Sequence, residues 1–224
     1  MKGNNNNCLV ENLQKNTNYE IKICFIYNQI FSSWTKINKI KTKDFDSIIL
    51  KESNKENEYL PKILEWSGYK NMDLIYRGTR DGMTSKDFHN KCDNKGPTIC
   101  LFKNEKGNIV GGYTPISWNT DNQYHQSSEC FLFTLTNIYG ISPTKFSNSN
   151  IQYSVYHHSS YGPTFGGGHD IYIDSNFLSN SNQSYFPYSY NDVLGKGKSI
   201  FTGDSNNNNA YFKLKEMEVF LLLK

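Results

Sequence analysis

Two residues with catalytic potential lie three positions apart in the segment Phe88-His-Asn-Lys-Cys-Asp93. On a helix, His89 and Cys92 would share one face, where an imidazole can act as the base for a thiol. The same pair could serve as metal ligands, but a metal site needs three or four. No CxxC motif is present, and His157, His158 and His169 have no spacing that fixes a ligand geometry. The sequence therefore leaves Cys92 and His89 as an alternative catalytic site and predicts no bound metal and no cofactor.

The chain contains only two arginines, Arg77 and Arg80, although lysine is used freely. A guanidinium group matches a carboxylate through two parallel hydrogen bonds, which an ammonium group cannot do. Asp81 predicts a turn that fixes Arg80, and Glu216 and Glu218 share one face of a predicted strand. We expect Arg80 to form a structural fork with an acidic side chain. Two solvated arginines are the alternative.

Glycines mark a third candidate site, in the segment Tyr161-Gly-Pro-Thr-Phe-Gly-Gly-Gly-His-Asp170. Bare backbone amides can cradle an anion, but no Gly-Lys-Ser/Thr ending follows, so a phosphate-binding loop is not favoured. Tight turns and close strand packing are one use for such glycines; a surface that lets a partner's backbone approach closely is the other. The candidate binding residues are Arg80, Gly112, Gly166, Gly167, Gly168, His169 and Asp170.

The elements that must position these residues are predicted to be mainly strands. The 224-residue chain has 15% aromatic residues and a single alanine, Ala210, so the best helix former is almost absent. Short helices are expected at about 55–66, delayed or interrupted by Pro61, and from a Thr84 cap to about 92. Strands are predicted at 72–76, 98–103, 108–116, 130–135, 151–157, 165–173, 199–202 and 210–223.

Residues 1–45 show a separate pattern, because positions 8 to 42 alternate as half-buried strands do. Leu13, six residues before Tyr19, resembles the tyrosine corner of a fibronectin type III domain. A complete domain of that family needs about 100 residues. We therefore interpret residues 1–45 as its C-terminal part, with a hairpin of the main domain as the alternative. The charged segment 44–57 is predicted to be a linker.

Six signatures follow in order along residues 46–224. They are Tyr76-Arg-Gly-Thr-Arg-Asp-Gly82, Phe88-His-Asn-Lys-Cys-Asp93, Gly111-Gly-Tyr113 with Trp118, Phe131-Leu-Phe-Thr-Leu135, Tyr161 to Asp170, and Glu216-Met-Glu-Val-Phe220. Together they resemble the TLDc domain family. The resemblance implies a mainly β, β-rich α+β fold: a two-sheet antiparallel β-sandwich with a few short helices. It also implies a link to oxidative-stress resistance and binding of the vacuolar proton pump (V-ATPase), and it supplies no catalytic residue to carry over.

Charge, hydropathy and cysteine usage narrow the range of partners. A net charge of +3 is too small for a typical nucleic-acid binder, so no nucleic-acid partner is expected. No stretch reaches the roughly 18 apolar residues of a membrane-spanning helix. Five cysteines without paired spacing indicate reduced thiols. We expect a cytoplasmic protein, peripheral to endolysosomal membranes through a partner.

Three function classes remain open on this basis. The first is a non-catalytic domain that binds a protein partner, with subunits of the vacuolar proton pump as the partner that the resemblance implies. The second is an enzyme that uses Cys92 and His89. The third is a small-ligand-binding β-sandwich module, whose aromatic contacts would be Tyr185, Phe186, Tyr188 and Tyr190.

Overall fold

The computed structural model describes residues 17–24, 26–27, 29–35, 38–41, 45–206 and 208–224. It divides the chain into two compact units, Met1–Asp46 and Ser47–Lys224. In the first unit β1 (Asn18–Ile21) pairs antiparallel with β4 (Asn38–Lys41), and β2 (Ile26–Tyr27) with β3 (Ile30–Phe31). Tyr19 lies on β1, but Leu13 falls outside the described residues. The fibronectin type III resemblance therefore stays a prediction.

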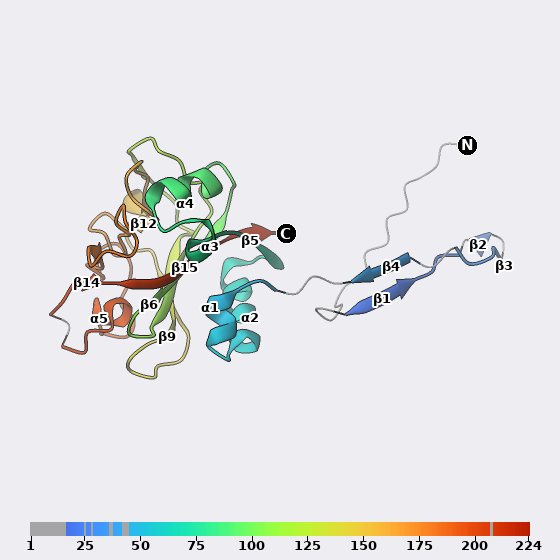
Figure 1. Ribbon diagram of the computed structural model, residues 1–224, viewed down its shortest axis with the longest axis horizontal. Helices are drawn as coiled ribbons and strands as arrows, with labels where there is room; N and C mark the ends of the chain where they lie inside the picture. Colours follow the sequence, from blue (N-terminus) through green and yellow to red (C-terminus); the bar gives the residue numbers. More distant parts are fainter. Residues whose placement is uncertain (1–16, 25, 28, 36–37, 42–44, 207) are drawn as a thin grey trace. The chain divides into compact units, whose positions relative to one another are not determined.

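The second unit is built on a six-stranded antiparallel sheet in the order β10-β9-β7-β6-β15-β5. Figure 1 shows β6, β9 and β15 passing through the middle of this unit. The strands are β5 (Asn71–Arg77), β6 (Thr98–Asn104), β7 (Ile109–Thr114), β9 (Phe131–Thr136), β10 (Thr144–Ser147) and β15 (Leu214–Leu223). The last strand, β15, lies between β6 and β5, which precede it by more than a hundred residues. The sheet therefore joins distant parts of the chain.

Shorter elements surround this sheet. A three-stranded sheet has the order β12-β11-β8, and β13 pairs with β14. These strands are β8 (Tyr124–His125), β11 (Val155–Tyr156), β12 (Thr164–Phe165), β13 (Asn182–Gln183) and β14 (Tyr211–Phe212). The helices are α1 (Ile48–Glu52), α2 (Glu56–Ser67), α3 (Gly78–Asp81), α4 (Ser85–Cys92) and α5 (Ser199–Thr202), with a 3₁₀ turn η1 (Ile151–Tyr153). Helices make up 18% and strands 33% of the residues that the structure describes, which confirms the β-rich fold class.

Local signals predicted some helices correctly and others not. Thr84 caps α4 as expected, because its side chain accepts a hydrogen bond from the Asp87 amide. Pro61 lies inside α2 and does not delay its start. Proline has no amide hydrogen to donate to the carbonyl of Asn57, but Asn57 is an exposed residue, so water can take the place of this hydrogen bond. The predicted strand at 199–202 is wrong. It forms α5, which ends at Gly203 in a left-handed conformation.

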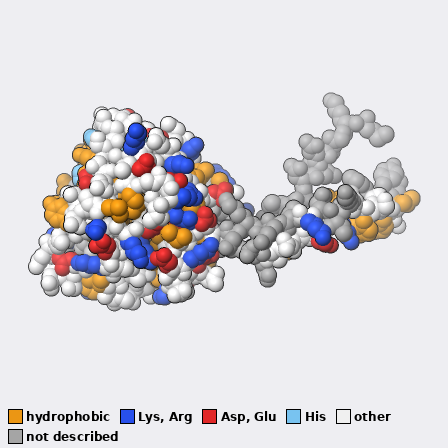
Figure 2. All heavy atoms as spheres, viewed as in Figure 1, with side chains coloured by type: hydrophobic (Ala, Val, Ile, Leu, Met, Phe, Trp, Pro, Cys, Tyr) orange, Lys and Arg blue, Asp and Glu red, His pale blue; other side chains and the backbone are white. Residues whose placement is uncertain are grey.

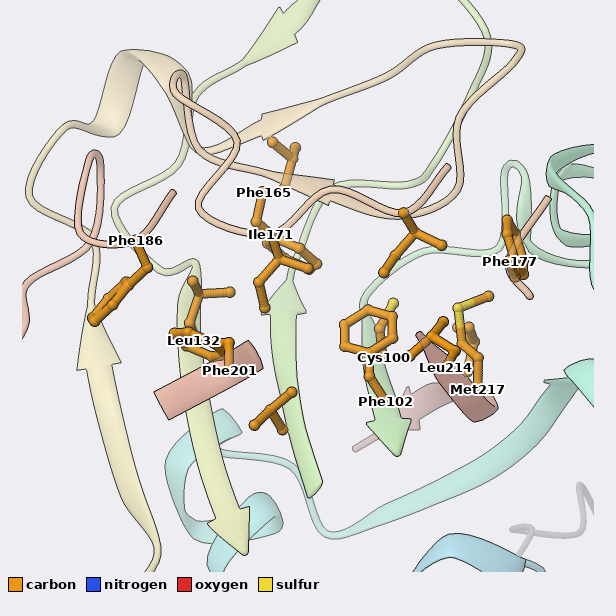
Figure 3. Packing of buried hydrophobic residues seen from close by; sticks show 14 of the residues in the cluster. Cys100, Phe102, Leu132, Phe165, Ile171, Phe177, Phe186, Phe201, Leu214 and Met217 are labelled. Atoms are coloured by element: carbon orange, nitrogen blue, oxygen red, sulfur yellow. The ribbon is translucent and has the colours of Figure 1, made fainter. Parts of the chain in front are cut away.

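The central strands of the larger sheet, β6, β7, β9 and β15, are buried on both faces, and Figure 3 shows the more extensive core. On that face Cys100, Phe102 and Val219 belong to one cluster with Phe165 and Phe201. On the opposite face α2 covers the sheet: the rings of Trp66 and Phe133 lie 5.9 Å apart. The Tyr59 hydroxyl is also 2.9 Å from Thr136 Oγ1.

Gly112 lies at the centre of this packing and not on a contact surface. It is buried in β7, and a Cβ atom there would lie 2.6 Å from Cζ of Phe165. Because no partner backbone can reach a buried position, the proposed contact role of Gly112 is corrected to close packing of β7 against Phe165.

We predict that Gly112→Ala destabilises the larger unit by about 1–3 kcal/mol, because the added methyl group overpacks the core. In a Phe165→Leu background the same substitution should cost measurably less, because the smaller side chain gives up the space. Urea unfolding of the four proteins measures this coupling. Strictly additive effects of the two substitutions would contradict the contact.

Candidate functional site

The glycine string forms a tight loop after β12. Gly166 has a φ of +85°, and a Cβ atom there would clash with the carboxylate of Asp170. A Cβ atom on Gly167 would lie 2.8 Å from Cβ of Tyr153, and one on Gly168 would clash with the ring of Tyr188. The turn-and-packing interpretation is therefore supported at all three glycines.

Asp170 anchors a second loop to this one. Its carboxylate is fully buried, and accepts hydrogen bonds from the backbone amides of Tyr188 (2.6 Å) and Ser189 (2.8 Å). Burial raises the pKa of Asp170, and the two amide hydrogen bonds oppose that rise. The hydroxyl of Ser189 accepts a further bond from the Gly167 amide (2.9 Å). Since its acceptors are occupied and buried, Asp170 cannot bind a partner directly, which corrects its assignment as a contact residue.

Aromatic side chains gather beside these two loops. Their rings contact one another at centroid separations of 4.0 to 6.4 Å. We call this group the aromatic cluster; its members are Tyr124, Tyr153, Tyr156, His158, Tyr161, His169 and Tyr172. His169, at φ +60°, stacks on Tyr172 with 5.1 Å between centroids. The cluster thus brings the predicted His169 together with tyrosines that sequence reasoning missed.

Part of this aromatic surface is open to solvent. Tyr124 and Tyr153 are 38% and 39% exposed, and Tyr185 and Tyr188 on the anchored loop are 46% and 64% exposed. Their loop neighbours Phe186 and Tyr190 are buried, at 2% and 1%. The four aromatics predicted for a small-ligand site are therefore divided between surface and core.

Cys92 and His89 do not form the expected nucleophile and base. Nδ1 of His89 lies 2.8 Å from Asp93 Oδ1, and Nε2 lies 3.0 Å from the backbone oxygens of His158 and Tyr161. Cys92 is fully buried, and burial raises the pKa of its thiol. Both ring nitrogens thus have partners other than the thiol. The helix holds the two residues at the predicted spacing, but it does not activate Cys92.

The other described thiols of the larger unit are equally shielded. Cys100 and Cys130 are buried, and burial raises the pKa of both, that of Cys130 to about 11. A thiol reacts as its thiolate, which a raised pKa disfavours. Cys92, Cys100 and Cys130 therefore pack as small apolar side chains, and Cys8 lies outside the described residues.

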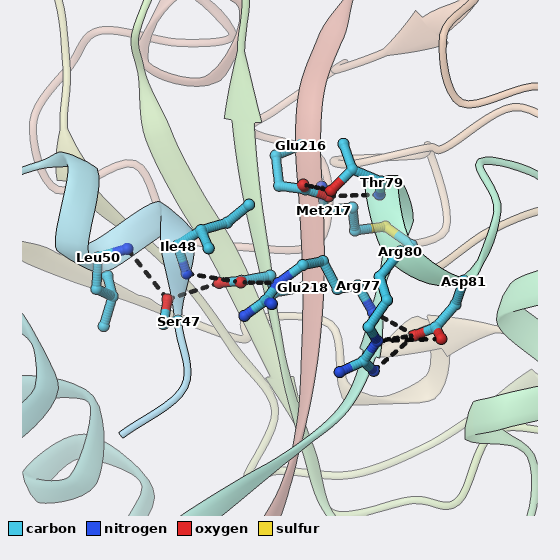
Figure 4. Close-up of polar contacts among 10 residues, drawn as sticks. All are labelled: Ser47, Ile48, Leu50, Arg77, Thr79, Arg80, Asp81, Glu216, Met217 and Glu218. Atoms are coloured by element: carbon cyan, nitrogen blue, oxygen red, sulfur yellow. Dashed lines mark hydrogen bonds and ion pairs between the residues drawn. The ribbon is translucent and has the colours of Figure 1, made fainter. Parts of the chain in front are cut away.

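The structural arginine is Arg77, as Figure 4 shows. Its Nε donates to Glu218 Oε1 at 2.9 Å, and the two side chains are 12% and 0% exposed. Glu218 also accepts bonds from the Ser47 hydroxyl (2.6 Å) and the Ile48 amide (2.9 Å). Burial raises the pKa of Glu218, and these three donors oppose the rise. The network ties the start of the larger unit to β5 and β15.

Arg80 is positioned differently from the expectation. It lies on α3, where its guanidinium pairs with the adjacent Asp81 at 2.7 Å, and its side chain is 45% exposed. Glu216 is engaged by Thr79 instead, through the backbone amide (3.2 Å) and the hydroxyl (2.5 Å). The expected fork of Arg80 with Glu216 or Glu218 is therefore wrong: the chain turns into a helix at Gly78, directly after Arg77.

A cluster of metal-ligating side chains was missed at the sequence level. Asp121, His125 and His157 bring their ligand atoms within 4.8 Å of one another. Burial lowers the pKa of His157 to about 3 and the nearby His125 adds to this, so its imidazole is neutral at pH 7. The i, i+4 spacing of Asp121 and His125 is the sequence signal that could have found the first two members.

Two observations on the described residues concern membranes and nucleic acids. None of the described helices is long and apolar enough to cross a bilayer. On the face of the larger unit shown in Figure 2, Lys and Arg side chains are interspersed with Asp and Glu. Such mixing does not build the continuous positive field that attracts nucleic acid.

We predict that Arg77→Lys destabilises the larger unit by about 1–3 kcal/mol, because an ammonium group cannot reproduce the guanidinium contact with the buried Glu218. Arg80→Lys is the matched comparison and should cost less, because the Arg80 side chain is 45% exposed and Asp81, itself only 9% exposed, also has Lys91 and the Arg77 amide as partners. The denaturant concentration at the midpoint of unfolding, at unchanged slope, measures the stability of each variant. Equal midpoints for the two variants would refute the assignment of Arg77.

Comparison with known proteins places this arrangement in a family. Two relatives share the description mTOR-associated protein MEAK7. The Danio rerio protein is 43% identical over 44 residues, which cover 20% of this chain and 10% of the relative. The Gallus gallus protein is 29% identical over 91 residues, or 38% of this chain and 19% of the relative. Both matches thus span less than a fifth of the relatives' length.

The family model of the TLDc domain matches residues 43–222, which is most of the chain and includes the six-stranded sheet except the last residue of β15. The resemblance expected from the ordered signatures is thereby confirmed. The chain belongs to the TLDc domain family.

Proposed function

We propose that the larger unit is a non-catalytic protein-interaction domain whose contact surface is formed by the aromatic cluster together with Tyr185 and Tyr188. The observation that carries this proposal is the exposure of four tyrosines, from 38% to 64%, beside the glycine loop. Tyrosine is enriched at interfaces, because its ring buries a large apolar area while its hydroxyl group keeps a polar partner. The predicted residues Gly167, Gly168 and His169 lie within this surface as its half-buried floor.

The way in which Tyr185 and Tyr188 are held supports the same role. Asp170 fixes the backbone at Tyr188, and the Tyr185 amide donates to the carbonyl of His169 at 3.0 Å. A side chain on an anchored loop loses less conformational freedom on binding than one on a free loop, which favours affinity. The loop therefore presents its two tyrosines in a preorganised geometry.

A non-catalytic role agrees with the state of the described nucleophiles. Cys92, Cys100 and Cys130 are buried with raised pKa values, and His89 is occupied by Asp93 and two carbonyls. An enzyme built on Cys92 and His89 would need an accessible thiolate beside a free imidazole nitrogen. This arrangement supports the binding function over the catalytic alternative.

We propose that the partner is the vacuolar proton pump. The interaction takes place on the cytoplasmic side of endolysosomal membranes and contributes to oxidative-stress protection. The family resemblance is the support for this partner and this setting. A second candidate partner comes from the two MEAK7 relatives, whose shared description is mTOR-associated. An assembly that contains mTOR is therefore tested alongside the pump.

We predict that Tyr185→Ser combined with Tyr188→Ser weakens binding of purified pump subunits by at least about tenfold, because central aromatic contacts dominate interface energy. Binding is measured by titrating the whole chain against the purified subunits, and in parallel against an mTOR-containing assembly. Loss of binding to the mTOR assembly alone would identify that assembly as the partner.

The matched control is Tyr211→Ser, which removes a tyrosine of similar exposure, 48%, from β14. This variant should bind as the parent chain does. Thermal unfolding confirms that each variant is folded. If the folded double variant binds both partners as tightly as the parent, the aromatic surface is not the contact surface.

A further inference from the structure

Three side chains converge where β8 meets β11. Tyr124 lies opposite Tyr156 in this antiparallel pair, and His125 lies opposite Val155. Since successive residues of a strand point to opposite faces, His125 and His157 share the face turned away from the two tyrosines. Their rings are 4.1 Å apart between centroids. Asp121 precedes β8, and its Oδ2 atom lies 3.0 Å from His125 Nε2.

His157 is the unusual member of this group. It is only 1% exposed, yet neither Nδ1 nor Nε2 has a hydrogen-bond partner among the described residues. His89, by comparison, has partners at both ring nitrogens. Buried polar atoms are nearly always paired, so an orphaned imidazole that faces a histidine and a nearby carboxylate points to a ligand that completes the site.

We infer that Asp121, His125 and His157 form a binding site for a zinc ion, a site that departs from the metal-free expectation of the sequence. Two imidazole nitrogens and a carboxylate oxygen are a donor set typical of zinc, with the fourth position left to water. The side chain of Asp121 is 40% exposed and that of His125 26%, which gives the ion a route from solvent.

The His125 and Asp121 side chains must rotate to complete the coordination sphere, because the rings of His125 and His157 lie nearly face to face, at an interplanar angle of 30°. Ligand atoms about 2.0–2.2 Å from a tetrahedral zinc ion lie about 3.3 Å from one another, whereas those of the three residues lie within 4.8 Å. Asp121 and His125 are exposed enough to turn toward the ion. The ring of His157 is held against Trp118, at 5.2 Å between centroids, and acts as the fixed ligand.

The test is equilibrium dialysis of the whole chain against zinc chloride after treatment with a chelator, with the bound metal measured by elemental analysis. We expect one zinc ion per chain that depends on this site. His125→Ala and Asp121→Ala should each weaken binding at least about tenfold. Cobalt in place of zinc should give the strong visible absorption of a tetrahedral site, and this absorption should be lost in both variants.

His158→Gln is the matched control, because it removes the histidine next to His157 without touching the three ligands. It should bind zinc as the parent chain does. Since a substitution at the buried His157 can prevent folding, the two exposed ligands carry the test, and thermal unfolding confirms that their variants are folded. Absence of stoichiometric zinc in the parent, or unchanged affinity in folded His125→Ala, would overturn the site.

Discussion

The surface architecture of the larger unit depends on one buried carboxylate, that of Asp170. Its two oxygens accept the backbone amides of Tyr188 and Ser189, so a charge that is costly to bury is compensated by main-chain donors of a loop 18 residues away. The carboxylate occupies the space that a side chain at position 166 would need, which explains the glycine there. The glycine string and the loop that carries Tyr185 and Tyr188, which we call the tyrosine loop, are therefore held together by the same carboxylate.

A second buried carboxylate joins distant segments in the six-stranded sheet. Glu218 on β15 accepts bonds from Ser47, Ile48 and Arg77, which joins segments as much as 171 residues apart. Removing one partner of such a group leaves a buried charge uncompensated, which costs far more than the loss of a surface ion pair. Buried carboxylates thus hold together distant segments that the apolar core alone would not align in register.

Features with local causes could be predicted from the sequence. The Thr84 cap and the strands around Cys100, Gly112 and Phe133 follow from patterns a few residues long, and the structure has them. The segment at 199–202 was predicted as a strand, because four residues are too few to separate a strand period from a helical turn. The turn predicted at Asp81 is the end of a helix that begins at Gly78, and this helix pairs Arg80 with Asp81 and not with a glutamate of β15.

The candidate sites depend on contacts that no local pattern encodes. The spacing of His89 and Cys92 was predicted, but the two carbonyls that contact Nε2 of His89 come from a segment about 70 residues away. The capture of Tyr188 by Asp170, and the meeting of His125 with His157, likewise require the fold. Sequence reasoning found the glycine loop; the structure shows that its residues support exposed tyrosines.

The central claim is that Asp170 holds the tyrosine loop in its binding geometry, and Asp170→Asn tests it most directly. Asparagine keeps the shape but replaces one acceptor oxygen with a donor, so one of the Tyr188 and Ser189 amides loses its acceptor and the loop loses about 1–3 kcal/mol of stabilisation. Residue-resolved hydrogen exchange should show these two amides exchanging faster while those of β6 and β7 stay protected, and affinity for the pump, the partner that we propose, should fall. Unchanged protection at Tyr188 and Ser189, or unchanged affinity despite their faster exchange, would contradict the account.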